Sequence, residues 1–152
     1  MMLSMLFMMM IISVAAAKRI CEVLDEEIDI IDTYSSAENV VTAGEIEFKN
    51  VSFRYYKHSE DPVLSNINLS IPAGSTVGII GSTGCGKTTL VSLIPRLYDC
   101  DEGEVLIDGV NVRDYSLYNL REGVGMVLQK NLLFSGTIKE NLRWGNPTAT
   151  DE

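Results

Sequence analysis

The chain has few basic residues, since 12 lysines and arginines stand against 21 aspartates and glutamates and the formal net charge is -9. Proteins that bind nucleic acid present clustered Lys and Arg to the phosphate backbone, so this balance argues against a nucleic-acid partner. Any phosphate that the chain binds must therefore be held locally, by backbone N–H groups and one or two well-placed cations.

Cysteine is scarce as well, with three residues at wide, irregular spacing: Cys21, Cys85 and Cys100. An odd number at such spacing matches neither a disulfide framework nor a zinc site, and it favours a reducing cytosolic setting. The composition, with 46% hydrophobic and 22% charged residues in a chain of 152, indicates one folded domain with a core.

The first segment, residues 1–17, has only two polar side chains, Ser4 and Ser13, and ends at Lys18 and Arg19. The run predicts the end of a transmembrane helix, and because a full span needs about 20 apolar residues, we expect a cut helix. The basic pair after the run favours a cytoplasmic location for the rest of the chain. Two alternatives stay open: a signal peptide, although its charges would precede the apolar core, and a buried helix of a soluble domain.

Changes in composition divide the chain into three parts. Residues 1–34 are expected to comprise the end of the transmembrane helix and an acidic linker helix, 35–44 a loop, and 45–152 the globular domain. We interpret the acidic residues of the linker as a solvated face and not as a metal site. Residues 45–55 and 64–71 alternate apolar and polar side chains, with a break at each, which predicts an antiparallel β layer.

The most informative motif lies between a predicted strand and a predicted helix. Residues 76–80 form a short apolar run typical of a buried parallel strand, and 89–97 carry apolar side chains at helical spacing. Between them, residues 81–88 have the sequence GSTGCGKT, which matches the P-loop pattern G-x-x-x-x-G-K-[ST]. The predicted fold class is therefore α/β: a P-loop NTPase core with a partial parallel sheet and flanking helices, an antiparallel β layer, and a preceding N-terminal apolar helix.

The residue types of this motif suit a triphosphate. Glycines allow backbone angles that let successive N–H groups converge on phosphates at the helix N-terminus. Lys87 is expected to reach the β- and γ-phosphates, and the Thr88 hydroxyl to ligate Mg²⁺. The predicted ligands are thus ATP and Mg²⁺. The residues predicted to bind them here are Gly81, Ser82, Thr83, Gly84, Cys85, Gly86, Lys87, Thr88 and Thr89.

Further segments fall in the order and at the distances seen in the nucleotide-binding domains of ABC transporters, and together they cover nearly the whole chain. Residues 51–55, VSFRY, resemble the A-loop of that family, which implies that Tyr55 stacks on adenine, with Tyr56 as a possible substitute. Residues 124–129, VGMVLQ, resemble the strand that ends in the Q-loop glutamine. The resemblance implies a catalytic and metal-binding role for Gln129, near Mg²⁺ and the attacking water.

Two segments resemble the exporter branch of the family: residues 132–142, where the domain meets the transmembrane part, and residues 17–25, after the last transmembrane helix. The resemblance implies a subunit of an ABC exporter in the cell membrane, with its nucleotide-binding part on the cytoplasmic side, that hydrolyses ATP to drive transport. The implied partners are a second nucleotide-binding domain, in a homo- or heterodimer, the transmembrane domain of the same transporter, and the membrane.

One segment imitates a different motif. Residues 105–108, VLID, look like the strand and terminal aspartate of a Walker B motif, but Gly109 follows directly and indicates a turn. In the family this aspartate opens a hairpin, so we expect Asp108 outside the magnesium site. A competing hypothesis is a self-contained P-loop phosphotransferase that uses Asp108 for magnesium, and a third is a non-enzymatic, membrane-tethered interaction fragment.

Other parts with which the family hydrolyses ATP are not found. No hydrophobic strand ending in an acid follows Gln129, and no signature loop is present; the sole histidine, His58, precedes the P-loop and cannot be the switch residue. Residues 150–152 are a helix start signal without a helix. We therefore expect a fragment, cut at both ends, that binds ATP weakly and turns it over negligibly.

Overall fold

A computed structural model describes residues 2–26, 28–32, 39–56 and 59–150 of the chain. His58 and the first part of the expected loop at 35–44 lie outside these residues, as do Asp151 and Glu152 of the expected helix start.

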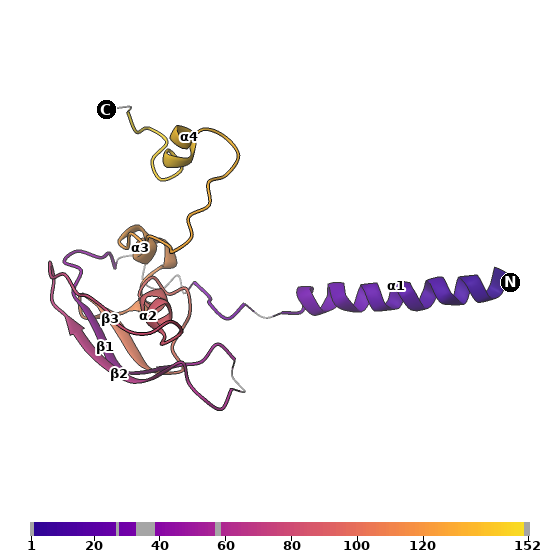
Figure 1. Cartoon of the computed structure of the whole chain (residues 1–152), viewed down its shortest axis with the longest axis horizontal. Helices are drawn as coiled ribbons and strands as arrows, with labels where there is room; N and C mark the ends of the chain where they lie inside the picture. Colours follow the sequence, from indigo (N-terminus) through magenta and orange to yellow (C-terminus); the bar gives the residue numbers. More distant parts are fainter. Residues whose placement is uncertain (1, 27, 33–38, 57–58, 151–152) are drawn as a thin grey trace.

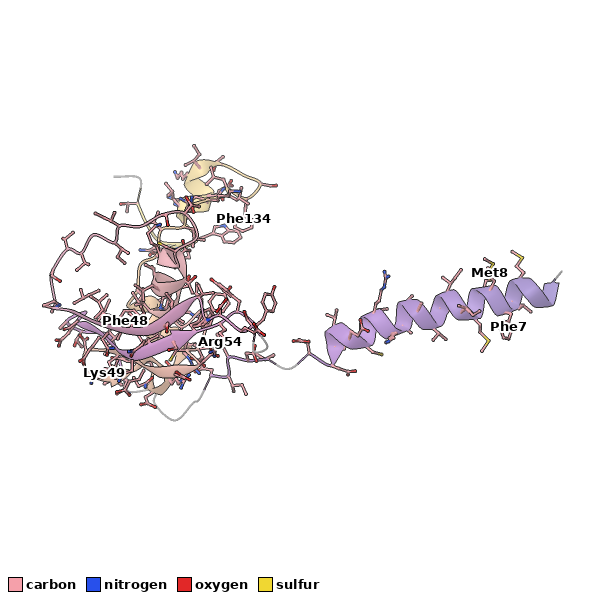
Figure 2. All side chains as sticks on the ribbon, turned by 60° about the horizontal axis from the view of Figure 1, so that its bottom comes forward. Phe7, Met8, Phe48, Lys49, Arg54 and Phe134 are labelled. Carbon is pink, nitrogen blue, oxygen red and sulfur yellow. The ribbon has the colours of Figure 1, made fainter. Side chains whose placement is uncertain are left out.

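Helix α1 runs from Met2 to Leu24 and projects away from the sheet (Figure 1). Its apolar side chains are exposed, as Phe7 and Met8 show near its N-terminal end (Figure 2). The Ser13 hydroxyl donates to the Met9 carbonyl at 2.8 Å, which satisfies this polar group inside the helix. The predicted N-terminal apolar helix is confirmed. Across the described ranges, however, no helix is long and apolar enough to cross a membrane.

The sheet has four strands in the order β2-β1-β3-β4, and every pairing between neighbours is antiparallel. The strands are β1 (Ile46–Phe53), β2 (Leu64–Ile71), β3 (Glu102–Ile107) and β4 (Val110–Asn111). The antiparallel layer predicted from residues 45–55 and 64–71 is thus confirmed, with β1 in its interior. The fold class is confirmed as α/β.

The breaks in alternation correspond to backbone irregularities in the strands. Asn50 has φ +51°, and the register between β1 and β2 shifts between Phe48 and Val51. The shift keeps Phe48, Val51 and Phe53 buried on the same strand, with exposures of 2%, 0% and 4%. Asn66 has φ +49° at the break in β2. These side chains anchor the core over which the helices pack.

The remaining helices are short: α2 (Lys87–Leu93), η2 (Val112–Asp114), α3 (Leu117–Glu122) and α4 (Ile138–Leu142). Leu93 and Leu120 bring α2 and α3 into the core, where Tyr115 donates its hydroxyl to the Ile107 carbonyl at 2.8 Å. Helix α2 ends earlier than the spacing over 89–97 predicts. Pro95 has no N–H to continue the helix, and Arg96 has a left-handed φ of +52°.

Two predicted strands are not formed, which corrects the expectation of a partial parallel sheet at these segments. Residues 76–80 and 124–129 form no strand and pair with no strand of the described chain. Ile80 is 98% exposed and Val127 88% exposed. An apolar run forms a buried strand only when neighbouring strands hydrogen-bond to its N–H and C=O groups. The pattern of apolar residues in the run does not show whether such neighbouring strands are present.

A matched pair of glycine variants tests the packing of β1 on β3. Gly103 and Gly109 both have φ +77°, which costs about 1 kcal/mol for a residue with a Cβ. A Cβ at Gly103 would collide with the carbonyl oxygens of Lys49 and Asn50, whereas a Cβ at Gly109 meets nothing within 4 Å. We expect Gly103→Ala to lower the free energy of unfolding by roughly 1–3 kcal/mol more than Gly109→Ala, as measured by denaturant titration. Equal losses would contradict this packing.

Candidate functional site

The P-loop joins helix α2 through two left-handed glycines. Gly84 has φ +84° and Gly86 has φ +89°, a conformation that other residues rarely adopt. Gly86 is the N-cap of α2, and its carbonyl accepts from the Leu90 N–H at 2.9 Å. The backbone requirement that the motif predicts is therefore met at these two positions.

Gly86 also lies directly against the sheet. A Cβ at this position would be 2.9 Å from Leu64 Cδ2 and 3.2 Å from the Val63 carbonyl oxygen. Within the loop, a Cβ on Gly81 would lie 2.5 Å from Cys85 Sγ. A side chain at 86 would have to displace the end of the Leu64 side chain and would be strained at a φ of +89°, so glycine suits both the shape of the P-loop and its close approach to β2.

Lys87 folds back over the loop that precedes it. Its Nζ donates to the Gly81 carbonyl at 2.8 Å and to the Ser82 carbonyl at 2.7 Å, with Cys85 Sγ at 3.5 Å. The ammonium group is thus held over the P-loop backbone by neutral acceptors. Phosphate oxygens are stronger, charged acceptors, so a bound phosphate would compete for this lysine.

Gln129 lies near the P-loop although 42 residues separate it from Lys87. Lys87, Thr88 and Gln129 line one cavity of about 360 Å³. Ile79, residues 126–128 and Val91 of α2 contribute the remaining wall. The structure therefore brings together the three residues predicted for the phosphate and magnesium end, while their chemical roles stay predictions.

The donor set of this cavity suits magnesium. A threonine hydroxyl and a glutamine amide oxygen are hard oxygen ligands, and Mg²⁺ commonly keeps water and phosphate oxygens in the rest of its shell. No group of three or more His, Cys, Asp or Glu residues that could hold a metal ion occurs in the described ranges. A magnesium ion here would depend on Thr88, Gln129 and the nucleotide itself.

Tyr55, the predicted base-stacking residue, lies beside α2. Its hydroxyl is hydrogen-bonded to the Thr89 hydroxyl at 2.9 Å, and either group can donate. Its ring makes T-shaped contacts with Phe53 and Tyr98, at centroid distances of 4.9 and 5.2 Å. The side chain is still 47% exposed, which leaves surface for a ligand. Tyr56 is 79% exposed and outside this cluster.

Sequence reasoning missed Tyr98, since a tyrosine after a helix carries no local signal of its own. It also missed how the chain next to Tyr55 is held. The Arg54 N–H donates to Asp101 Oδ2 at 2.7 Å, which ties the backbone before Tyr55 to the start of β3. Phe53, Tyr55 and Tyr98 line a second cavity, of about 520 Å³, with residues 28–30 of the linker.

Asp108 is engaged elsewhere. Its carboxylate accepts backbone hydrogen bonds from Thr42, Ala43 and Glu45, at 2.7, 2.9 and 2.9 Å, and a fourth from the Thr42 hydroxyl at 3.2 Å. These bonds, the Thr42 N–H first among them, lower the pKa of Asp108 from 3.8 to about 2. Asp108 thus anchors the loop before β1 and does not line the cavity of Thr88 and Gln129.

An antiparallel layer supporting a P-loop, with a glutamine brought to the same cavity, defines a nucleotide-binding domain of the P-loop class. The family model described as ABC transporter matches residues 64–152, more than half of the chain. The chain belongs to the ABC transporter family.

Relatives and a solved structure agree with this assignment. Two Staphylococcus aureus proteins, from strains NCTC 8325 and COL, are named as putative multidrug export ATP-binding/permease proteins. Each is 46% identical to this chain over 131 residues, which are 86% of this chain and 22% of the relative. The structure of a bacterial Atm1-family ABC exporter with ATP bound superposes with a TM-score of 0.80 at 31% identity, over 98% of this chain and 26% of that one. The chain therefore spans about a fifth to a quarter of the length of these proteins.

The contacts of Asp108 predict a pH-dependent contribution to stability. Its pKa is lowered on folding, so its contribution is fully present above about pH 4 and is lost as the pH falls from 3.8 towards 2. We expect Asp108→Asn to lower the melting temperature at pH 7, because a neutral amide oxygen is the weaker acceptor. The difference from the unsubstituted chain should shrink between pH 4 and pH 2, as followed by circular dichroism.

The same variant separates the two hypotheses for Asp108. We expect magnesium-dependent ATP binding at pH 7, below the melting temperature, to be unchanged in Asp108→Asn. A large loss of that binding would favour the phosphotransferase hypothesis. A melting difference that stays constant with pH would contradict the contacts of Asp108 with residues 42–45.

Proposed function

We propose that this chain is the ATP-binding portion of an ABC exporter subunit, which couples ATP binding and hydrolysis at paired nucleotide-binding domains to export of a substrate across a membrane. One observation carries the proposal: Lys87, Thr88 and Gln129 line a single cavity at the end of a P-loop. The family assignment and the names of the relatives support the exporter branch.

Lys87 and the P-loop backbone bind the phosphates. On binding, the Lys87 ammonium exchanges the carbonyl oxygens of Gly81 and Ser82 for the charged oxygens of the β- and γ-phosphates. The N–H groups at the start of α2, presented by the left-handed glycines, add neutral donors to the same anion. This local arrangement explains how a chain of net charge -9 can hold a triphosphate.

Thr88 and Gln129 serve the metal and the attacking water. A bound magnesium ion would supply charge neutralisation at the phosphate oxygens. The Thr88 hydroxyl would hold the ion, and the Gln129 amide would orient the water. No Asp or Glu is among the described residues that line this cavity. We therefore propose that this chain by itself binds ATP with negligible turnover.

The segment after Gln129 is proposed to face the transmembrane domain. Thr137 and Glu140 form a capping box that starts α4, and Asn141 accepts from the Phe134 N–H at 2.8 Å. This hydrogen-bonded turn carries exposed apolar side chains, and Figure 2 shows Phe134 on it, apart from the sheet that carries Phe48. In the segment from residue 130 to residue 144, the exposed large apolar residues are Leu132, Leu133, Phe134, Ile138, Leu142 and Trp144.

Helix α1 is proposed to be the end of the transmembrane helix that leads into the nucleotide-binding domain. All of its described apolar side chains are exposed, which suits a lipid or protein environment better than water. Lys18 and Arg19 follow its apolar part, an arrangement that favours the cytoplasmic side for the domain.

Two lysine variants test the phosphate role. Lys87→Ala should weaken magnesium ATP binding by roughly 10- to 100-fold, because a charged hydrogen-bond donor to the triphosphate is lost. Lys49→Ala is the matched control, since Lys49 lies on β1 and pairs with Glu47 at 3.1 Å. Isothermal titration calorimetry measures both. Equal affinities for the two variants would refute a P-loop site.

A further inference from the structure

Arg121 of helix α3 bonds to the C-terminal end of the P-loop helix. Its Nε donates to the Pro95 carbonyl at 3.3 Å and its Nη2 to the Arg96 carbonyl at 3.1 Å. Both acceptor residues are buried and lie in the turn that ends α2. The last carbonyls of a helix have no partner within it, and the planar fork of an arginine can bond two of them at once. Arg121 therefore caps α2 from a neighbouring helix.

The same residue holds the start of the segment that leads to Gln129. The Arg121 carbonyl accepts from the Val124 N–H at 3.4 Å, and the Val124 side chain packs against the core. Gly123, between these two residues, is so close to the loop before β1 that a Cβ on it would lie 2.5 Å from Val41 Cβ. Residues 124–129 thus begin at a fixed point beside the end of α2.

From this point the segment runs along α2 towards the phosphate end of the site. At the C-terminal end of the helix, Pro95 lines a cavity of about 390 Å³ together with residues 123–127. In the first turn, Lys87 and Thr88 line the cavity of about 360 Å³ together with residues 126–129. Segment and helix therefore run in opposite directions, and the place where the segment starts decides which turn of α2 its last residue faces.

We propose that Arg121 is a positioning residue for Gln129. Its guanidinium fixes the start of residues 124–129 to the end of α2, so that Gln129 comes to face Lys87 and Thr88. This inference rests on the proposed function, because it takes Gln129 as a residue that serves magnesium and the attacking water. Arg121 acts only through Gln129, since it is not among the described residues that line their shared cavity.

The benefit of this anchor is preorganisation, and it concerns the metal more than the phosphates. A Gln129 that is already in place loses less conformational freedom when magnesium binds with the nucleotide. The phosphate loop is held independently, at the opposite end of α2, where Gly86 lies against the start of β2. Loss of the Arg121 bonds should therefore weaken ATP binding when magnesium is present and leave metal-free ATP binding nearly unchanged.

The sequence supplies a direct probe, because Gln129 is the only glutamine in the chain. Labelling the full chain with ¹⁵N-glutamine gives one side-chain amide group in the NMR spectrum. Its resonances are recorded with ATP and EDTA, and again with ATP and magnesium. In the unsubstituted chain we expect the side-chain amide of Gln129 to shift when magnesium is added. Isothermal titration calorimetry under the same two conditions gives the affinities.

The test variant is Arg121→Met, which removes the guanidinium and keeps an apolar stem. The magnesium-dependent shift of Gln129 should fall by about half or more, and affinity for magnesium ATP about 3- to 10-fold, while metal-free affinity changes less than twofold. Arg113→Met is the matched control. Arg113 also donates to a backbone carbonyl, that of Cys100 at 2.6 Å, but from η2, so both the shift and the affinities should stay as in the unsubstituted chain.

The outcomes separate this inference from the proposed function. A full Gln129 shift in Arg121→Met, or an equal loss of affinity with and without magnesium, would overturn the positioning role. If Arg121→Met does not fold, as judged by circular dichroism, Arg121→Lys makes the same test, because a point donor on a flexible stem does not replace the planar fork. An unsubstituted chain that binds no ATP, or whose Gln129 does not respond to magnesium, would instead refute the proposed function.

Discussion

The close approach of Gly86 to the start of β2 is the constraint on which the site depends. A Cβ there would lie 3.2 Å from the Val63 carbonyl oxygen and 2.9 Å from Leu64 Cδ2, so α2 and its P-loop sit directly on the strand. Leu64 pairs with Phe53 in the sheet, and the Phe53 ring contacts Tyr55. One pair of strand ends therefore supports both the phosphate loop and the proposed base site. The antiparallel layer therefore supports both ends of the proposed nucleotide site.

The two ends of the site differ in how they are built. The base end is held by the Tyr55 to Thr89 bond and by two aromatic contacts, all close to the sheet. The phosphate and metal end is framed by the segments 76–80 and 124–129, which form no strand and whose apolar side chains are largely exposed. Lys87 meanwhile bonds to the loop backbone. The proposed base site is thus fixed by packing, whereas the proposed metal site depends more on the nucleotide.

Local rules in the sequence predicted much of this arrangement. Alternation and its breaks predicted β1 and β2, and the structure has Asn50 and Asn66 at positive φ at those breaks. The P-loop pattern predicted glycine at Gly84 and Gly86, where φ is positive. Gly109 after Asp108 correctly indicated a turn. The parts that failed depend on distant partners. An apolar run at 76–80 cannot show whether a strand lies beside it, and nothing near Thr89 indicates a tyrosine 34 residues earlier. Among the predictions that failed, one could have been made correctly from the sequence: Pro95 indicates that α2 ends before the apolar spacing does.

The central claim is that ATP and magnesium bind at the P-loop, between Tyr55 and Gln129. Titrating the isotopically labelled chain with magnesium ATP and following the backbone amide resonances by NMR tests it most directly. We expect the largest shifts on residues 81–89, with further shifts at Tyr55 and Gln129, and no change at residues 42–45 around Asp108. Shifts centred on residues 42–45 and Asp108, with none in the P-loop, would contradict the claim.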